Sequence, residues 1–281
     1  MRARSATVAV LGALLACGRA SDRTAAAGDT SDSGGTNADA AAAVGAVADC
    51  STTQVDGNPI SACVIQPANV GHLRIAPAPR PAKRDWTIAA LDSTLRAHDK
   101  RLGMAMNAGI FRTDGTPSGL LVANGIELSR LATGAGPSAR DRNRCAVNFY
   151  CLPNGVFFIS DGEAHVLSTQ DFARSRPPLA SITLATQSGP MLVEAGKVAR
   201  RFPASFDKRI PRNAVCVRND GTVVLVLAPN QTHATLADLL IARFACRDAL
   251  FLDGSISALY TGQGAPPSLF DYGAIVYVAI P

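Results

Sequence analysis

The sequence has few aromatic residues and no long apolar run beyond its first residues. Only 5% of its 281 residues are Phe, Trp or Tyr. After the N-terminal segment, no stretch reaches the roughly 20 apolar residues that a membrane-spanning helix needs. The net charge of +5 comes from scattered Arg and Lys, without a basic stripe interleaved with aromatic residues. The sequence therefore argues against internal membrane spans and against nucleic-acid binding, and supports at most a mild preference for anionic ligands.

Several catalytic signatures are also absent from the chain. It has no Gly-x-Ser-x-Gly elbow, Walker loop, Rossmann fingerprint or His-Glu-x-x-His motif. No Cys-x-x-Cys occurs, and the four His residues are far apart in the sequence, so a zinc site is not expected. The sequence predicts no cofactor, and leaves open whether a divalent metal takes part.

The N-terminal segment has the pattern of an export signal. Met1–Arg4 is basic and Val8–Ala16 is apolar, which predicts a signal peptide over residues 1–16. The segment Leu14–Cys17 resembles the bacterial lipobox, so Cys17 is predicted to carry lipid and to anchor the exported protein to a membrane of the cell envelope. The alternative is ordinary secretory cleavage a few residues later, with Cys17 discarded.

The composition divides the rest of the chain into a tether and one domain. Residues 17–48 are rich in Ala, Gly, Ser, Thr and Asp and contain no aromatic residue, which predicts a disordered tether after the lipidated Cys. Residues 49–281 show no internal repeat or low-complexity break. Their length of about 230 residues fits a single β-rich domain.

Six cysteines fall in this domain, at positions 50, 63, 145, 151, 216 and 246. An even number in an exported chain predicts disulfides. Cys50 with Cys63 is favoured because the pair would close a short polar loop. Cys145 with Cys151 is harder to form, since six residues of straight strand span about 20 Å, whereas a disulfide needs Cα atoms about 5.5 Å apart. The remaining pairings stay open.

The alternation of short β-type runs and turn signals predicts an α+β domain. We expect mixed, largely antiparallel sheets built from hairpins and packed against a few helices. One helix is predicted over Trp86–Lys100 with Asp85 as its cap, and a second from a capping-box-like start at Thr235. Strands are predicted at Gly103–Phe111, Ala214–Val217, Val223–Leu227, Ala249–Leu252 and Ala274–Ile280.

Three segments carry polar residues and glycines that the strand pattern does not require. They are Met106–Phe111 with Pro117–Leu120, Thr186–Met191, and Leu252–Ser257. Each occurs where a strand meets a turn, which is where binding residues tend to collect. The alternative is that Gly and Ser serve only the chemistry of the turns.

In their order and spacing, these segments and one further strand resemble the phosphodiester glycosidase family, in its bacterial exported branch. The resemblance extends over roughly residues 103–260. A departure at Ser255-Ile256, where the glycosidase branch is richer in Gly, bears on the substrate more than on the fold. The matching segments are Asn107–Phe111 (Asn-Ala-Gly-aromatic, slightly altered), Gln187–Pro190 (Gln-Ser-Gly-Pro), Arg212–Gly221 (Arg-x-Ala-hydrophobic with an Asp-Gly turn) and Ala249–Ser257 (Ala-Leu-x-Leu-Asp-Gly-x-x-Ser).

The chemistry that the resemblance implies suits particular residues in these segments. Cleavage of a sugar-1-phosphodiester at the anomeric carbon expels a phosphate monoester, so a strong general acid is dispensable. The site needs donors for the phosphate and a carboxylate that activates water or stabilises an oxocarbenium-like state. Arg212 is the candidate phosphate fork, with a surface salt bridge as the alternative. Asp253 is the candidate carboxylate, with an Asx-turn cap as the alternative.

The remaining candidates are predicted to bind substrate. Asn107 would orient sugar or phosphate through its amide, and Gln187, Ser188 and Gly189 would form an anion-binding concavity, unless each only shapes a turn. Weaker candidates from the last segment are Gly254, Ser255 and Ser257.

We therefore expect a hydrolase that cleaves glycosyl phosphodiesters of cell-envelope or extracellular polysaccharide. One alternative is a non-catalytic, lipid-tethered module that binds envelope glycan with the same residues. Another is a transferase that moves the sugar to an acceptor, which an acceptor-dependent product would reveal.

Overall fold

The fold was determined from a computed structural model of the whole chain. The structure describes residues 47–79, 85–133, 149, 154–175, 177–199, 202, 208–254 and 256–281. All of them belong to one compact unit, Gly35–Pro281. The predicted signal peptide, Cys17, the tether up to residue 46, Cys145, Cys151 and Ser255 lie outside the described residues. Ala48 is buried in the central core, so the packed part begins at least one residue before the predicted Asp49.

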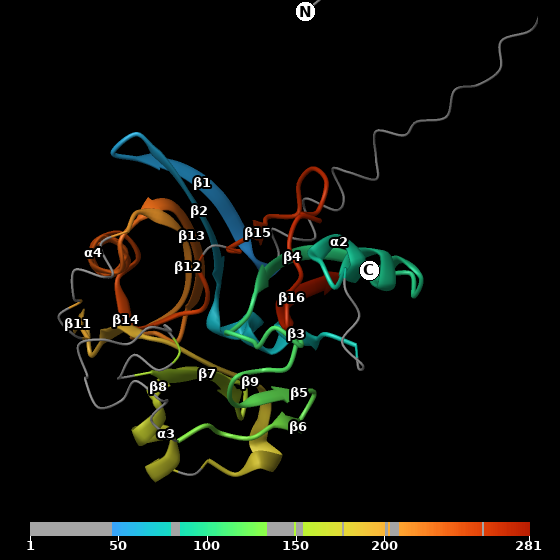
Figure 1. Cartoon of the computed structure of the whole chain (residues 1–281), viewed down its shortest axis with the longest axis horizontal. Helices are drawn as coiled ribbons and strands as arrows, with labels where there is room; N and C mark the ends of the chain where they lie inside the picture. The colour runs from blue at the N-terminus through green and yellow to red at the C-terminus, as the bar shows by residue number, and fades with distance from the viewer. Residues whose placement is uncertain are drawn as a thin grey trace, which may run out of the picture. The chain divides into compact units, whose positions relative to one another are not determined.

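Three antiparallel sheets make up the described part of the fold, with helices packed against them (Figure 1). The first sheet has the order β1 (Asp49–Val55), β2 (Asn58–Ile65), β13 (Val223–Gln231), β12 (Ile210–Arg218), β14 (Cys246–Phe251), β10 (Met191–Glu194) and β11 (Lys197–Val198). The second has the order β15 (Leu259–Tyr260), β4 (Arg101–Asn107), β16 (Ala274–Ile280) and β3 (Arg74–Pro77). The third has the order β6 (Ile126–Ser129), β5 (Leu121–Ala123), β9 (Ile182–Ser188), β7 (Gly155–Ser160) and β8 (Glu163–Ser168).

The helices of the described residues are short. They are α2 (Ile88–Arg96), α3 (Thr169–Ser175) and α4 (His233–Phe244), with 3-10 turns η1 (Pro67–His72) and η3 (Leu179–Ser181). Every named strand pair is antiparallel, and the α+β fold predicted from the sequence is confirmed.

The hairpin of β12 and β13 forms the centre of the first sheet and was predicted from its Asp-Gly turn. Val215 and Leu225 face a central core to which all three sheets contribute, whereas Cys216 and Val224 face α4. Because successive side chains of a strand point to opposite faces, a sheet covered on both faces needs apolar residues at nearly every position. This explains the unbroken apolar runs of these two strands.

Both predicted helices form, but their starts differ from the prediction. Thr87 caps α2, because its Oγ1 accepts a hydrogen bond from the backbone N–H of Ala90 at 3.0 Å. Asp85 lies before this cap, at φ +76, and donates its own N–H to Asp271. Helix α4 begins at His233 after Thr232, which forms a reciprocal capping box with Thr235. The predicted starts were wrong by two to three residues because several Asp and Thr side chains near each helix can serve as caps.

Two disulfides lie in the first sheet. Cys50 and Cys63 are opposite residues of β1 and β2 and are bonded, which confirms the favoured pairing. Cys216 of β12 is bonded to Cys246, the first residue of β14. Disulfides form and persist in oxidising compartments, so they are consistent with secretion.

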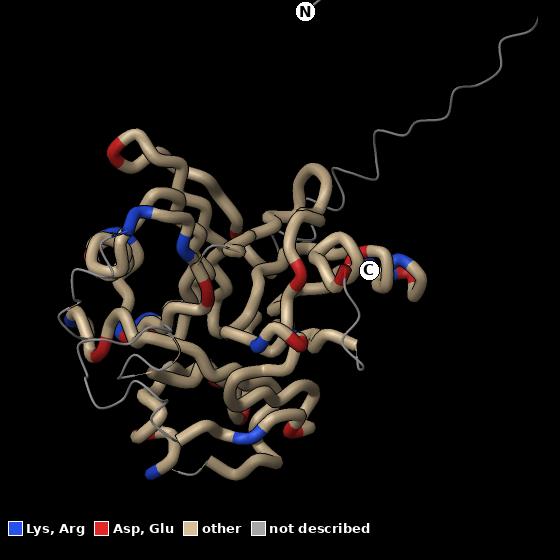
Figure 2. The backbone as a smooth tube through the Cα atoms, viewed as in Figure 1, with Lys and Arg blue, Asp and Glu red and all other residues tan. Residues whose placement is uncertain are grey.

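Charged residues are dispersed over the described residues, with Lys and Arg intermixed with Asp and Glu (Figure 2). Within this part of the chain, no helix combines the length and hydropathy that crossing a membrane would require.

Loss of the Cys216–Cys246 disulfide should destabilise the fold. Replacing both residues with Ala frees a loop whose ends are 30 residues apart, which increases the conformational entropy of the unfolded chain. We expect the free energy of unfolding to fall by about 2–4 kcal/mol in denaturant titrations under oxidising conditions. An unchanged unfolding midpoint would show that this bond does not contribute to stability.

Candidate functional site

Two buried amide side chains connect the end of β4 to β12 and to the residue that follows β14. Asn107 ends β4 and Asn213 lies in β12, and they are 1% and 0% exposed. The Nδ2 of Asn213 donates to Oδ1 of Asn107 at 2.9 Å, and its Oδ1 accepts the backbone N–H of Asp253 at 2.8 Å. Oδ1 of Asn107 also accepts the N–H of Ala258 at 2.9 Å. Amide hydrogen bonds therefore join three of the family motifs, Asn107–Phe111, Arg212–Gly221 and Ala249–Ser257.

Asp253 follows β14 and is partly buried. Burial raises the pKa of its carboxyl group to about 6, and the hydrogen bond from the N–H of Gly254, which favours the charged form, only partly opposes this effect. No ion pair joins Asp253 to a Lys or Arg among the described residues. The carboxylate is therefore mostly ionised at neutral pH, but it lies in an environment that disfavours its charge.

The turn after Asp253 holds the carboxylate in place. Gly254 donates its N–H to Oδ1 of Asp253 at 2.5 Å, and Ser257 donates its hydroxyl to the carbonyl of Asp253 at 2.9 Å. The N–H of Ser257 also bonds the carbonyl of Gly254. Gly254 and Ser257, both sequence candidates for substrate binding, thus fix the conformation of the residue that bears the carboxylate.

The Gln187–Pro190 motif, which begins at the end of β9, lies beside the Asp253 turn. The Ser188 hydroxyl, which is fully buried, donates to the carbonyl of Leu252 at 2.7 Å. Gly189 is buried and leads through a cis peptide with Pro190 into β10. The N–H of Gly109 donates to Thr186 Oγ1 at 3.2 Å. All four motifs of the sequence therefore meet in one hydrogen-bonded region.

Gln187 has all the hydrogen bonds that its amide can use within the protein. Its Oε1 accepts from the N–H groups of Leu120 and Ala132, and its Nε2 donates to Ala132 O and Thr169 Oγ1. A Cβ at Gly119 would lie 2.2 Å from that Oε1. In the structure, Gln187 holds two loop segments together through these bonds.

Arg212 is 2% exposed and points to the face of the first sheet that carries α4. Its nitrogens donate to the carbonyls of Gln231 at 2.7 Å and Lys208 at 2.8 Å, and Nη1 lies 3.2 Å from His233 Nε2. The guanidinium also lies 5.6 Å from the centre of the Phe251 ring. Burial lowers the pKa of Arg212 to about 10. Since Asn213 is the next residue of the strand, the two side chains lie on opposite faces.

Buried donors without a partner lie close to this network. Among the described residues, Nδ2 of Asn107, the hydroxyl of Tyr272 and Nε1 of Trp86 are buried and take no hydrogen-bond partner. Tyr272 donates its backbone N–H to the carbonyl of Trp86. The sequence analysis identified Asn107 but missed Tyr272 and Asn213. Tyr272 lies outside the four motifs. Asn213 lies inside one of them, but in the sequence it looks like an ordinary strand residue.

The described residues contain no cluster of three or more His, Cys, Asp or Glu side chains that could hold a metal ion. The unpaired buried donors, which include Nδ2 of Asn107 and the hydroxyl of Tyr272, suit oxygen acceptors of a ligand.

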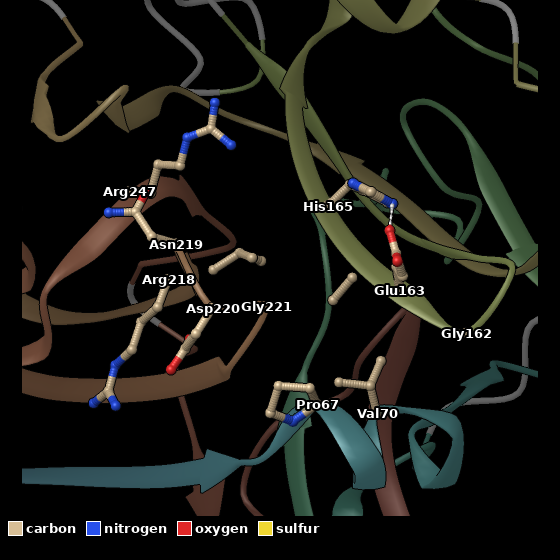
Figure 3. Close-up of a pocket in the computed structure, with 12 residues that line it drawn as sticks. Pro67, Val70, Gly162, Glu163, His165, Arg218, Asn219, Asp220, Gly221 and Arg247 are labelled. Carbon is tan, nitrogen blue, oxygen red and sulfur yellow. Dashed lines mark ion pairs between the residues drawn. The ribbon is translucent and has the colours of Figure 1, made fainter.

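A separate groove lies at the other end of the β12–β13 hairpin (Figure 3). Asn219 and Asp220 of the turn, with Arg218 and Arg247, line one side, and His165 lines the other, paired with Glu163 at 3.9 Å. Its lining includes neither Asn107 nor Asp253.

The geometry and the sequence motifs agree with comparisons to known proteins. The model of the family described as phosphodiester glycosidase matches residues 100–269, which is more than half of the chain. The chain therefore belongs to the phosphodiester glycosidase family.

Individual relatives and solved structures are also similar to this chain. The chain is 31% identical over 165 residues to the protein YigE of Escherichia coli (strain K12), a match that covers 58% of this chain and 60% of that protein. The fold is similar to the zebrafish N-acetylglucosamine-1-phosphodiester alpha-N-acetylglucosaminidase catalytic domain, which a pro-peptide auto-inhibits. The TM-score is 0.55 at 15% identity, with 82% of this chain and 81% of that chain covered. A Synechocystis protein described as hypothetical has a TM-score of 0.50 at 13% identity, over 83% of this chain and 62% of its own.

Gly109 has no room for a side chain, and Gly109→Ala should disturb the meeting of the motifs. An added Cβ would lie 2.5 Å from the carbonyl oxygen of Gln187 and 2.8 Å from Thr186 Oγ1. We expect a loss of about 1–3 kcal/mol in the free energy of unfolding, measured by thermal or denaturant unfolding. Gly71→Ala, where an added Cβ meets nothing within 4 Å, is the matched control and should change stability by less than about 0.5 kcal/mol.

Asp253→Asn should stabilise the fold at neutral and alkaline pH. The folded-state pKa of about 6 is above the unfolded value of about 3.9, so ionisation of Asp253 destabilises the native state increasingly as the pH rises from about 4 to 6. We expect the variant to gain about 3 kcal/mol over the wild type at pH 8, and almost nothing below pH 4, in denaturant titrations at several pH values. A gain that did not depend on pH would contradict this account of Asp253.

Proposed function

We propose that the protein is a hydrolase that cleaves glycosyl phosphodiesters, with Asp253 as its reacting carboxylate. The observation that supports this most directly is the position of Asp253. Its raised pKa and lack of a cationic partner occur where all four family motifs meet. Perturbed carboxylates in such positions are frequent at catalytic sites.

The proposed reaction replaces the phosphate at the anomeric carbon with water. The bond between the anomeric carbon and the phosphate oxygen breaks, and its electron pair leaves with the phosphate monoester. Ionised Asp253 stabilises the positive charge that develops on the sugar or accepts the proton of the attacking water. The proton passes to solvent, and the products are a free sugar and a phosphate monoester.

In this proposal Arg212 acts as a positioning residue. Its hydrogen bonds to Lys208, Gln231 and His233 connect the start of β12 to the end of β13 and the start of α4. Asn213, the next residue, is thereby held in place to orient Asp253. Ser188, Gly254 and Ser257 hold the backbone and the carboxylate around Asp253, Gln187 holds the neighbouring loop segments, and Gly189 leads the chain from β9 into β10. Asn107 offers its free Nδ2 to the substrate.

The cellular setting of the proposal rests on the sequence. The signal peptide and the lipobox-like Leu14–Cys17 support export and anchoring through lipid on Cys17, with polysaccharide of the cell envelope or its surroundings as the source of the phosphodiester.

The proposal is tested by incubating the purified protein, disulfides intact, with a panel of sugar-1-phosphodiesters that includes N-acetylglucosamine-1-phosphate esters. We expect release of free sugar, and a loss of about 10²-fold or more in Asp253→Asn, because the amide cannot carry the charge of the carboxylate. Asp238→Asn, an exposed Asp of α4, is the matched control and should keep wild-type rates.

The pH dependence of kcat/KM provides an independent check. If the carboxylate is the active form, the rate should rise with pH through an apparent pKa of about 6 and level off above it. Sugar binding without release from any member of the panel would instead favour the tethered glycan-binding module.

A further inference from the structure

Tyr272 has a hydroxyl that the fold does not use. The residue is 2% exposed and lies two positions before β16. Its backbone N–H donates to the carbonyl of Trp86. Its hydroxyl has no hydrogen-bond partner among the described residues. Leaving a buried polar group unpaired destabilises the folded state. Phe would fill the same space without that cost, so the hydroxyl suits a partner that the described residues do not supply.

The surroundings of Tyr272 place it beside the candidate site. Its ring shares an apolar cluster with Ala258, whose N–H bonds Oδ1 of Asn107. Two residues further on, the carbonyl of Ala274 accepts the N–H of Ala108 at 2.9 Å. These contacts of its neighbours place Tyr272 near the end of β4, where Asn107 lies.

Burial and nearby negative charges both affect the hydroxyl group of Tyr272. Burial raises the pKa of Tyr272 to about 12, and the negative charges of Asp253 and Asp271 add to this effect. The hydroxyl therefore keeps its proton at neutral pH and acts as a donor. The N–H of Asp85 bonds Oδ1 of Asp271, whereas Asp253 forms no ion pair with a Lys or Arg in the part of the chain that the structure describes.

We propose that the Tyr272 hydroxyl and Asn107 Nδ2 are neutral donors that hold oxygen atoms of the glycosyl group of the substrate, and not its phosphate. Both donors are buried and have no hydrogen-bond partner within the described part of the chain, so a ligand oxygen would satisfy each of them. An anionic phosphate at Tyr272 would be repelled by ionised Asp253, whereas sugar hydroxyl or acyl oxygens carry no charge. This assignment deepens the proposed function and rests on it for the identity of the ligand.

Direct binding measurements test the assignment without requiring turnover. The probes are N-acetylglucosamine and inorganic phosphate, each titrated into wild type and Tyr272→Phe by calorimetry or NMR. We expect Tyr272→Phe to weaken N-acetylglucosamine binding about 5- to 10-fold, which is the contribution of one hydrogen bond, and to leave phosphate binding unchanged. Asn107 is not varied for this purpose, because its Oδ1 holds Asn213 and Ala258.

Two controls separate this role from a structural one. Tyr277→Phe removes the hydroxyl of a partly buried Tyr further along β16 and should leave both affinities unchanged. The unfolding midpoint of Tyr272→Phe should equal or exceed that of the wild type, because no hydrogen bond within the protein is lost.

The outcomes are distinct. Unchanged N-acetylglucosamine binding in Tyr272→Phe, an equal loss for both probes, or no N-acetylglucosamine binding by the wild type would each overturn the assignment. Binding that depends on Tyr272, together with no cleavage of any phosphodiester, would support the assignment and reject the hydrolase.

Discussion

The hydrogen bond between the amides of Asn107 and Asn213 is the contact on which the candidate site depends. Both side chains are buried, so every polar atom that they leave unpaired weakens the fold. Asn213 uses its nitrogen for Asn107 and its oxygen for the backbone of Asp253. This leaves Asn107 with its oxygen bonded and its nitrogen free. One amide pair thus joins two sheets, orients the carboxylate and determines which atom remains available to a ligand.

Because side chains alternate along β12, Arg212 and Asn213 lie on opposite faces of the sheet and have different roles. Arg212 points to the face covered by α4 and is held by Lys208, Gln231 and His233. Asn213 points the other way, to Asn107 and Asp253. The charged residue, Arg212, therefore stabilises the start of β12. The neutral residue that follows it, Asn213, contacts the site. Burial keeps the pKa of Asp253 high, and no Lys or Arg among the described residues forms an ion pair with it.

The sequence predicted most of the architecture but less of the site. The β12–β13 hairpin was found because its turn carries a local Asp-Gly signal, and the cross-strand Cys50–Cys63 bond was found because the loop between the two residues is short. Asp253 and Asn107 stood out as polar residues at strand ends. The bonds of Gln187 and Arg212 were not foreseen, because their partners come from segments 18 to 67 residues away for Gln187 and from the next strand and α4 for Arg212. Asn213 looked like an ordinary strand residue, and no local pattern reveals that Tyr272 lacks a partner.

The long sequence separations within the site have a consequence for how the chain folds. Asn107 bonds residues 106 and 151 positions away, and Ser188 bonds one 64 positions away. Closing such long loops costs entropy before the contacts can compensate, so high contact order slows folding. Individual hairpins can form early, but the carboxylate and its donors come together only when nearly the whole domain has folded. A half-length fragment would keep some of the family motifs and have none of the site.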